Sequence, residues 1–87
     1  LQNSTNNLQL DLEAQKALQS SLSAKKIAAL KKDNYQKSLN QYAQGILSSD
    51  NLLLSFIEAG NAELTAISAH AQYLYSQSKI KINNTVQ

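Results

Sequence analysis

The side chains that could carry out chemistry in this 87-residue chain are few and poorly placed for it. His70 is the single histidine, and no cysteine or second histidine stands at metal-ligand spacing from it, so we interpret it as a structural residue that packs or faces water. Asp11 and Glu13 are two residues apart, which on a helix places them on different faces. Glu58 and Glu63 are five apart and make no acid and base pair. We therefore expect no enzymatic activity, no metal site and no cofactor.

The composition narrows the remaining functions. Cysteine, proline, methionine and tryptophan are absent, which excludes disulfides, a thiol nucleophile and a Cys-bearing zinc site. The chain has eight lysines, no arginine and a net charge of only +2, so a nucleic-acid partner is not expected. Its most apolar run, residues 52–57, is far shorter than the roughly 18 residues that span a bilayer, so this segment should make no membrane contact. A chain this short has a small core, so we expect it to need contacts with partner chains for stability.

Any functional residue must be positioned by long helices, because helix-breaking residues are nearly missing. There is no proline, the two glycines are Gly45 and Gly60, and Leu, Ala, Lys, Gln and Ser are abundant. Turn-forming residues gather only at 45–51, where Gly45 can adopt a left-handed conformation and Ser48 or Ser49 can cap a new helix. The sequence thus predicts an all-α fold: one antiparallel coiled-coil hairpin, with a helix at about 6–44, a turn at 45–49 and a helix at about 49–83.

The second helix carries an apolar heptad repeat. Residues at alternating spacings of four and three form what we call the aliphatic seam: Leu53, Ile57, Gly60, Leu64, Ile67, Ala71 and Leu74. A second line lies one position earlier and is broken by Glu63 and His70: Leu52, Phe56, Ala59, Ala66 and Tyr73. The apolar arc is therefore wider than one helix contact requires, and we expect this helix to have two neighbours.

The first helix has a shorter apolar stripe, at Tyr35, Leu39, Tyr42 and Ile46. Lys32 and Lys25 interrupt it before Ala28, Leu18 and Ala14 can extend it. Folding the chain near Leu47 should pack Leu39 and Tyr42 near Leu52, Leu53 and Phe56.

The charges favour the same hairpin. Five of the lysines lie within residues 25–37, whereas the second helix is acidic and free of lysine up to residue 78. The expected pairs are Lys37 with Glu58, and Lys31 or Lys32 with Glu63. The lysine cluster is interleaved with Asp33 and is typical of a solvated face.

Residues around the turn resemble a known family. Tyr42, Gly45, Ser48 and Leu53 follow the pattern at the turn of the periplasmic helical hairpins of TolC-like outer-membrane efflux proteins. The returning helix also matches at Ala62, Leu64, Ala69 and Tyr73, and the first helix at Leu10-Asp11-Leu12, so the similarity covers nearly the whole chain. The chain departs from the family pattern at two positions. Gln41 stands where the family has Arg, and Asn51 stands where the family has Asp, although this chain has an aspartate one residue earlier, at Asp50.

The resemblance implies a part of an export channel. Members of this family form trimers with an outer-membrane β-barrel and a periplasmic α-helical tunnel, and they work with an adaptor and an inner-membrane pump. This chain would be a fragment of such a tunnel, periplasmic in location, trimeric in the parent channel and forming dimers or bundles alone. Its tip would dock the periplasmic adaptor protein through Gly45, Ile46, Leu47, Ser48 and Ser49, with Ile46 and Leu47 as apolar contacts.

Two other interpretations fit the same residues. The periplasmic adaptor itself contains a helical hairpin that turns at Gly and Ser, and flanking lipoyl-like strands in the parent sequence would identify it. A generic structural coiled coil, serving as a spacer or an assembly module, is the second.

Overall fold

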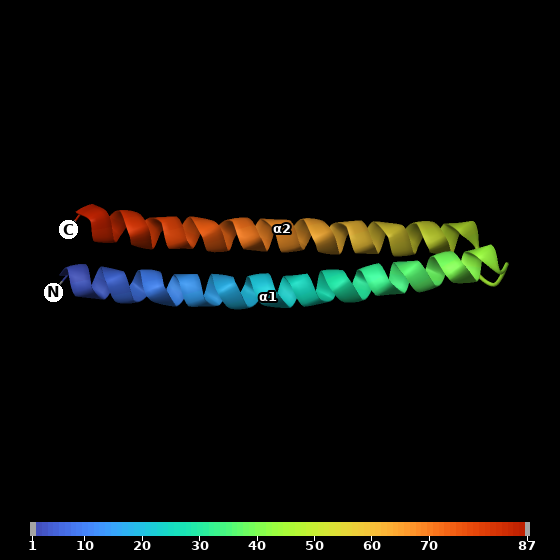
Figure 1. Cartoon of the computed structure of the whole chain (residues 1–87), viewed down its shortest axis with the longest axis horizontal. Helices are drawn as coiled ribbons and strands as arrows, with labels where there is room; N and C mark the ends of the chain where they lie inside the picture. The colour runs from blue at the N-terminus through green and yellow to red at the C-terminus, as the bar shows by residue number, and fades with distance from the viewer. Residues whose placement is uncertain (1, 87) are drawn as a thin grey trace.

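The chain forms an antiparallel two-helix hairpin, as the sequence predicts. The structure, a computed structural model, describes the backbone of residues 2–86 and the side chains of residues 8–83. Helix α1 spans Gln2–Ala43 and helix α2 spans Ser49–Val86, joined by residues 44–48. The helices run side by side, with the two chain ends together and the turn at the opposite end (Figure 1). The backbone measures 65 × 15 × 14 Å, so the molecule is a thin rod.

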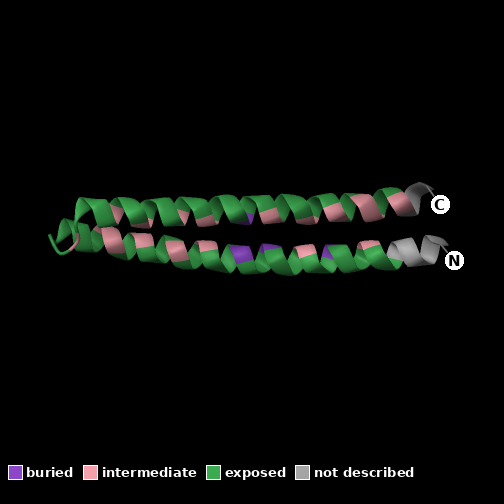
Figure 2. Ribbon diagram, turned by 180° about the vertical axis from the view of Figure 1, so that it is seen from behind, coloured by how far each residue is buried: buried purple, intermediate pink, exposed green. Residues whose placement is uncertain are grey.

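The two helices meet along a line of mostly small side chains, which we call the small-residue seam. Buried and half-buried positions recur along each helix at alternating spacings of three and four, on the sides that face each other (Figure 2). Along this line they are, on α1, Leu10, Ala14, Ala17, Ser21, Ala24, Ala28, Lys31, Tyr35 and Ser38, and on α2, Leu52, Ser55, Ala59, Ala62, Ala66, Ala69, Tyr73, Ser76, Ile80 and Asn83. Ser21, Ala24 and Ala66 are the most buried, with 2%, 8% and 8% of their surface exposed.

Small residues at these positions let the helix backbones approach closely. Alanine loses no rotamer freedom when it is buried, so ordering this seam costs little side-chain entropy. Larger residues enter only near its ends, where Tyr35 lies beside Phe56 with ring centroids 5.4 Å apart. The hairpin thus has a narrow contact layer and no core of large side chains: no described side chain is both large and fully buried.

The aliphatic seam lies outside this contact, on the side of α2 turned away from α1. Leu53, Leu64 and Ile67 are 57%, 66% and 61% exposed. The expected packing of Leu53 and Tyr42 within the hairpin is therefore wrong, since both are exposed. Leu39 and Leu52 are half-buried as expected, and Phe56, although 55% exposed, packs against Tyr35 of α1. The physical reason is that α1 has no matching stripe of large apolar residues, whereas both helices present alanines and serines in the same heptad phase.

The pairing of the helices also differs from the expected register. Lys31, not Lys37, lies at Glu58, with Nζ 3.5 Å from Oε2. Ser38 donates a hydrogen bond to Ser55 Oγ over 3.1 Å. These pairs show that the hairpin folds about a point slightly before Leu47, so α1 is shifted relative to α2 by less than one helical turn. Lys32 remains near Glu63, as expected, since both line one groove.

Candidate functional site

The hairpin tip begins where Gly45 terminates α1. Gly45 has a φ of +77°, the left-handed conformation expected for it. The Gly45 amide donates to Tyr42 O over 3.0 Å and the Ile46 amide donates to Gln41 O over 2.9 Å. These two bonds form a Schellman motif, which satisfies carbonyls that the helix end would otherwise leave unpaired. The chain therefore reverses direction within a few residues and without a disordered loop.

Ser48 starts α2 as its N-cap. Its hydroxyl oxygen accepts a hydrogen bond of 3.2 Å from the Asn51 amide, and its carbonyl accepts one of 3.0 Å from Leu52. Of the two serines proposed to cap this helix, Ser48 is thus the one that does so. Asp50 stands in the first turn of α2, where a negative charge interacts favourably with the helix dipole. The returning helix is held by both a side-chain cap and a charge.

The turn presents one apolar side chain fully to solvent. Ile46 is 70% exposed, the highest value among the large hydrophobic residues described, while Leu47 is half-buried. Gly45, Ser48 and Ser49 are exposed beside it. The structure therefore brings the five predicted contact residues together at one end of the rod, and distinguishes an outward Ile46 from a Leu47 that turns partly inward.

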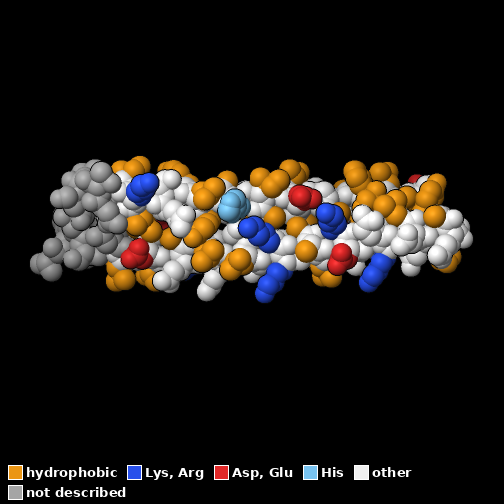
Figure 3. Space-filling model, in the orientation of Figure 1, with side chains coloured by type: hydrophobic (Ala, Val, Ile, Leu, Met, Phe, Trp, Pro, Cys, Tyr) orange, Lys and Arg blue, Asp and Glu red, His pale blue; other side chains and the backbone are white. Residues whose placement is uncertain are grey.

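The aliphatic seam is a second exposed apolar surface. Hydrophobic side chains lie along the outer edge of α2, and they are most continuous toward the tip (Figure 3). Ile57 and Leu74 are 47% and 48% exposed, and the other large members of the seam are more so. Monomeric soluble proteins rarely expose continuous apolar surfaces of this kind, which usually mark contacts with another molecule.

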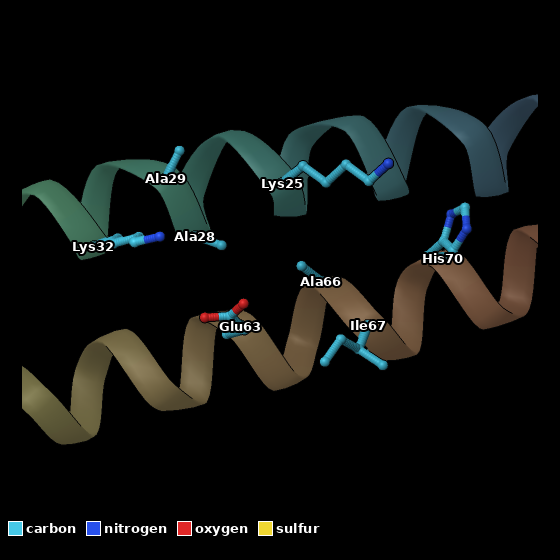
Figure 4. A pocket seen from close by; sticks show the side chains of 8 residues that line it. All are labelled: Lys25, Ala28, Ala29, Lys32, Glu63, Ala66, Ile67 and His70. Carbon is cyan, nitrogen blue, oxygen red and sulfur yellow. The ribbon is translucent and has the colours of Figure 1, made fainter.

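A shallow groove of about 400 Å³ runs between the helices at mid-length. Its floor is made by alanines, including Ala28 and Ala66, because such small side chains leave the space between the helices partly unfilled. Lys25 and Lys32 border it from α1, and Glu63 and His70 border it from α2 (Figure 4). The lysines that interrupt the apolar stripe of α1 thus stand beside the small-residue seam, not within it.

The described residues that border the groove form no cluster of metal ligands. His70 is exposed, and no group of three His, Cys, Asp or Glu side chains within residues 8–83 could hold a metal ion. In the part of the chain that is described, neither helix has a stretch long and apolar enough to cross a membrane. The distinctive features that remain are two exposed apolar surfaces, the hairpin tip and the aliphatic seam.

The small-residue seam was missed by reading the sequence for large apolar residues. Its signal is present, since Ala14, Ala17, Ser21, Ala24 and Ala28 repeat at spacings of three and four. Weighting alanine and serine as packing residues would have found this line and placed the leucines of α2 outside the hairpin.

Comparisons with protein-family models, with curated proteins and with solved structures give no match to this chain.

Proposed function

We propose that this hairpin is a wall element of the periplasmic α-helical tunnel of a TolC-like outer-membrane efflux protein, with its tip docking the periplasmic adaptor of the pump. The observation that carries the proposal is the presence of two contact seams on opposite sides of α2. One seam packs on α1 within the hairpin, and the aliphatic seam points away from it. A helix in a closed ring needs a neighbour on each side, which is the arrangement that such a pair of seams supports.

The tip supports the second half of the proposal. A free hairpin end would be expected to carry polar side chains, yet Ile46 is 70% exposed there. The Schellman motif and the Ser48 cap hold this residue on a defined backbone, so little conformational entropy would be lost when a partner binds it. The adaptor would contact Ile46 directly, with Leu47, Gly45, Ser48 and Ser49 around it.

The decisive experiment uses the full-length protein that contains this segment. Ile46→Asp should abolish efflux and site-specific cross-linking of the tip to the adaptor, because it places a charge in an apolar contact. Gln19→Asp is the matched control, since Gln19 is an exposed residue of α1 far from the tip along the chain. Trimer assembly and outer-membrane insertion should be normal in both variants.

Three results would contradict the proposal. If Ile46→Asp left drug susceptibility and cross-linking unchanged, the tip would not be the docking surface. If the cross-linked partner were an outer-membrane channel, the hairpin would belong to an adaptor, which is the alternative that the turn residues also fit. A spacer coiled coil would give no cross-linked partner from either class.

A further inference from the structure

The aliphatic seam of α2 extends at both ends into charged residues of opposite sign. Continuing its spacing of four and three toward the turn reaches Asp50, and continuing it toward the C-terminal end reaches Ser78 and then Lys81. The large members, among them Leu64 and Ile67, are exposed, as are both terminal charges. The seam thus has an acidic end, an apolar middle and a basic end.

We propose that this seam binds the same seam of a second copy of the chain, with the two α2 helices antiparallel. In this arrangement residues whose numbers sum to 131 face each other across a twofold axis. Leu64 meets Ile67 of the second copy at the centre, and Ile57 meets Leu74 further out. The product is a flat row of four helices, because each α1 lies on the far side of its own α2.

The layers of this seam are complementary in size. Large residues face large ones in the central layers, and the small Gly60 faces the small Ala71. In every layer, an a position of one helix faces a d position of the other, as in antiparallel coiled coils. The remaining layer sets Leu53 against Ser78, at the edge of the apolar region. A close approach at Gly60 and Ala71 is therefore flanked by apolar contacts on both sides.

The charges select the antiparallel orientation and its register. Asp50 faces Lys81 of the second copy at both ends of the interface, whereas a parallel pair in register would place aspartate against aspartate and lysine against lysine. A shift of one heptad in one direction would set Asp50 against Leu74, and a shift in the other would set Lys81 against Ile57. Either shift would bury a charge without its partner.

The positions beside the seam agree with the same register. On one flank, Glu63 lies diagonally across from His70 of the second copy, two positions from direct opposition, and both are exposed in the single hairpin. On the other flank, Leu54 lies diagonally across from Tyr75 of the second copy, and these residues are 54% and 64% exposed. An acid thus meets a base and an apolar residue meets an aromatic one.

Helix α1 of the second copy is a poorer occupant. The far side of α1 exposes leucines such as Leu12 and Leu22, but Gln19, Lys26 and Asp33 follow Leu12 at the same heptad position, so polar and charged residues interrupt its apolar surface. A contact of α2 with the same α2 surface is also isologous and closes after two copies, whereas a head-to-tail contact of α2 with α1 does not close after two copies and gives a ring or a filament. This inference concerns the isolated chain and does not rest on the proposed channel function: the twofold pair points the two tips in opposite directions, so it replaces the neighbour contact that the aliphatic seam would make in a tunnel wall.

The first test measures the association of residues 1–87 by analytical ultracentrifugation. The native chain should form a dimer as its concentration rises. Leu64→Asp should remove the dimer while far-ultraviolet circular dichroism remains helical, since Leu64 is 66% exposed in the hairpin. Leu30→Asp is the matched control, because Leu30 is 58% exposed but lies on α1, and it should keep the dimer.

The second test determines the relative orientation of the two α2 helices by disulfide cross-linking. The native chain has no cysteine, so only the introduced cysteines can react. Chains with Gly60→Cys should cross-link rapidly to chains with Ala71→Cys when the two are mixed, and neither should cross-link to itself. Residues 60 of the two copies would lie 11 positions apart along the interface, or about 16 Å.

Several results would overturn the proposal. They are a native chain that stays monomeric at millimolar concentration, a trimer or larger assembly in place of a dimer, a dimer that survives Leu64→Asp, or faster cross-linking of Gly60→Cys chains to one another. The last would show a parallel pair. A monomer would show that a second copy does not cover the seam.

Discussion

At the scale of single residues, the two glycines have opposite roles although neither has a crowded environment. A methyl group at Gly45 or at Gly60 would meet no atom within 4 Å. Gly45 has a φ of +77°, whereas Gly60 lies within α2, where glycine costs backbone entropy. The effect of alanine at each position should therefore come from the backbone alone.

We predict that Gly45→Ala destabilises the hairpin by about 1 to 2 kcal/mol, the usual cost of a left-handed non-glycine residue. Gly60→Ala should instead stabilise it by about 0.5 to 1 kcal/mol, from the higher helix propensity of alanine. Thermal unfolding of both variants, below the concentration at which the chain associates, measures the two changes. Changes of the same sign would contradict the assigned conformations.

The two serines at the start of α2 provide a second residue-scale prediction. Ser48→Ala removes the acceptor of the Asn51 amide and should lower the free energy of unfolding by about 1 kcal/mol. Ser49→Ala is the control, because Ser49 already lies inside α2 and its side chain is exposed, and it should change stability by less than about 0.5 kcal/mol. Urea titration of the two variants makes the comparison. Equal effects would mean that the cap contributes nothing.

At the scale of the elements, the contact between α1 and α2 depends on side chains that are small. Ala24→Leu would insert a large side chain where 8% of the alanine is exposed, so it should push the helices apart and cost about 1 to 3 kcal/mol. Ala29→Leu, at an exposed position of the same helix, should have little effect. Denaturant unfolding with matched concentrations tests this pair. A neutral Ala24→Leu would mean that the helices are not held at close approach.

The elements were more predictable from sequence than the way they face each other. Two helices and a turn could be predicted because the chain has no proline, Gly45 can adopt a left-handed conformation and Ser48 can cap a helix. These are local backbone preferences, and the tertiary contacts of the hairpin do not oppose them. Which face of α2 meets α1 depends on a matching surface of α1, so the strong pattern at Leu64 and Ile67 misled the prediction. The end of α1 was placed within one residue, and the register was missed because the alanines and serines of the small-residue seam set it, not the large apolar residues near the turn.

At the scale of the whole molecule, the hairpin is far from compact. Its radius of gyration is 19.3 Å, whereas a compact domain of this length would have about 12 Å. The value is dominated by the 65 Å length, so association side by side changes it little, while association tip to tip would nearly double the long dimension.

This shape gives a prediction for small-angle X-ray scattering. Across the concentration range in which the chain dimerises, the forward scattering should double while the radius of gyration rises only slightly. The cross-sectional radius should increase instead, since the pair forms a row of helices of nearly the same length. A steep rise of the radius of gyration would indicate contact through Ile46 at the tip.

The turn at one end also has a kinetic consequence. The contact between Ser38 and Ser55 closes a loop of only 17 residues. The contact between Glu13 and Lys79, whose charged groups lie 3.9 Å apart, closes a loop that contains most of the chain. Because loop-closure entropy grows with the enclosed length, folding should nucleate at the turn and proceed as a zipper toward the chain ends. Substitutions near Gly45 should then slow refolding, and those near Ala14 should mainly speed unfolding. Amide hydrogens should exchange fastest at the open end, where the hairpin frays first.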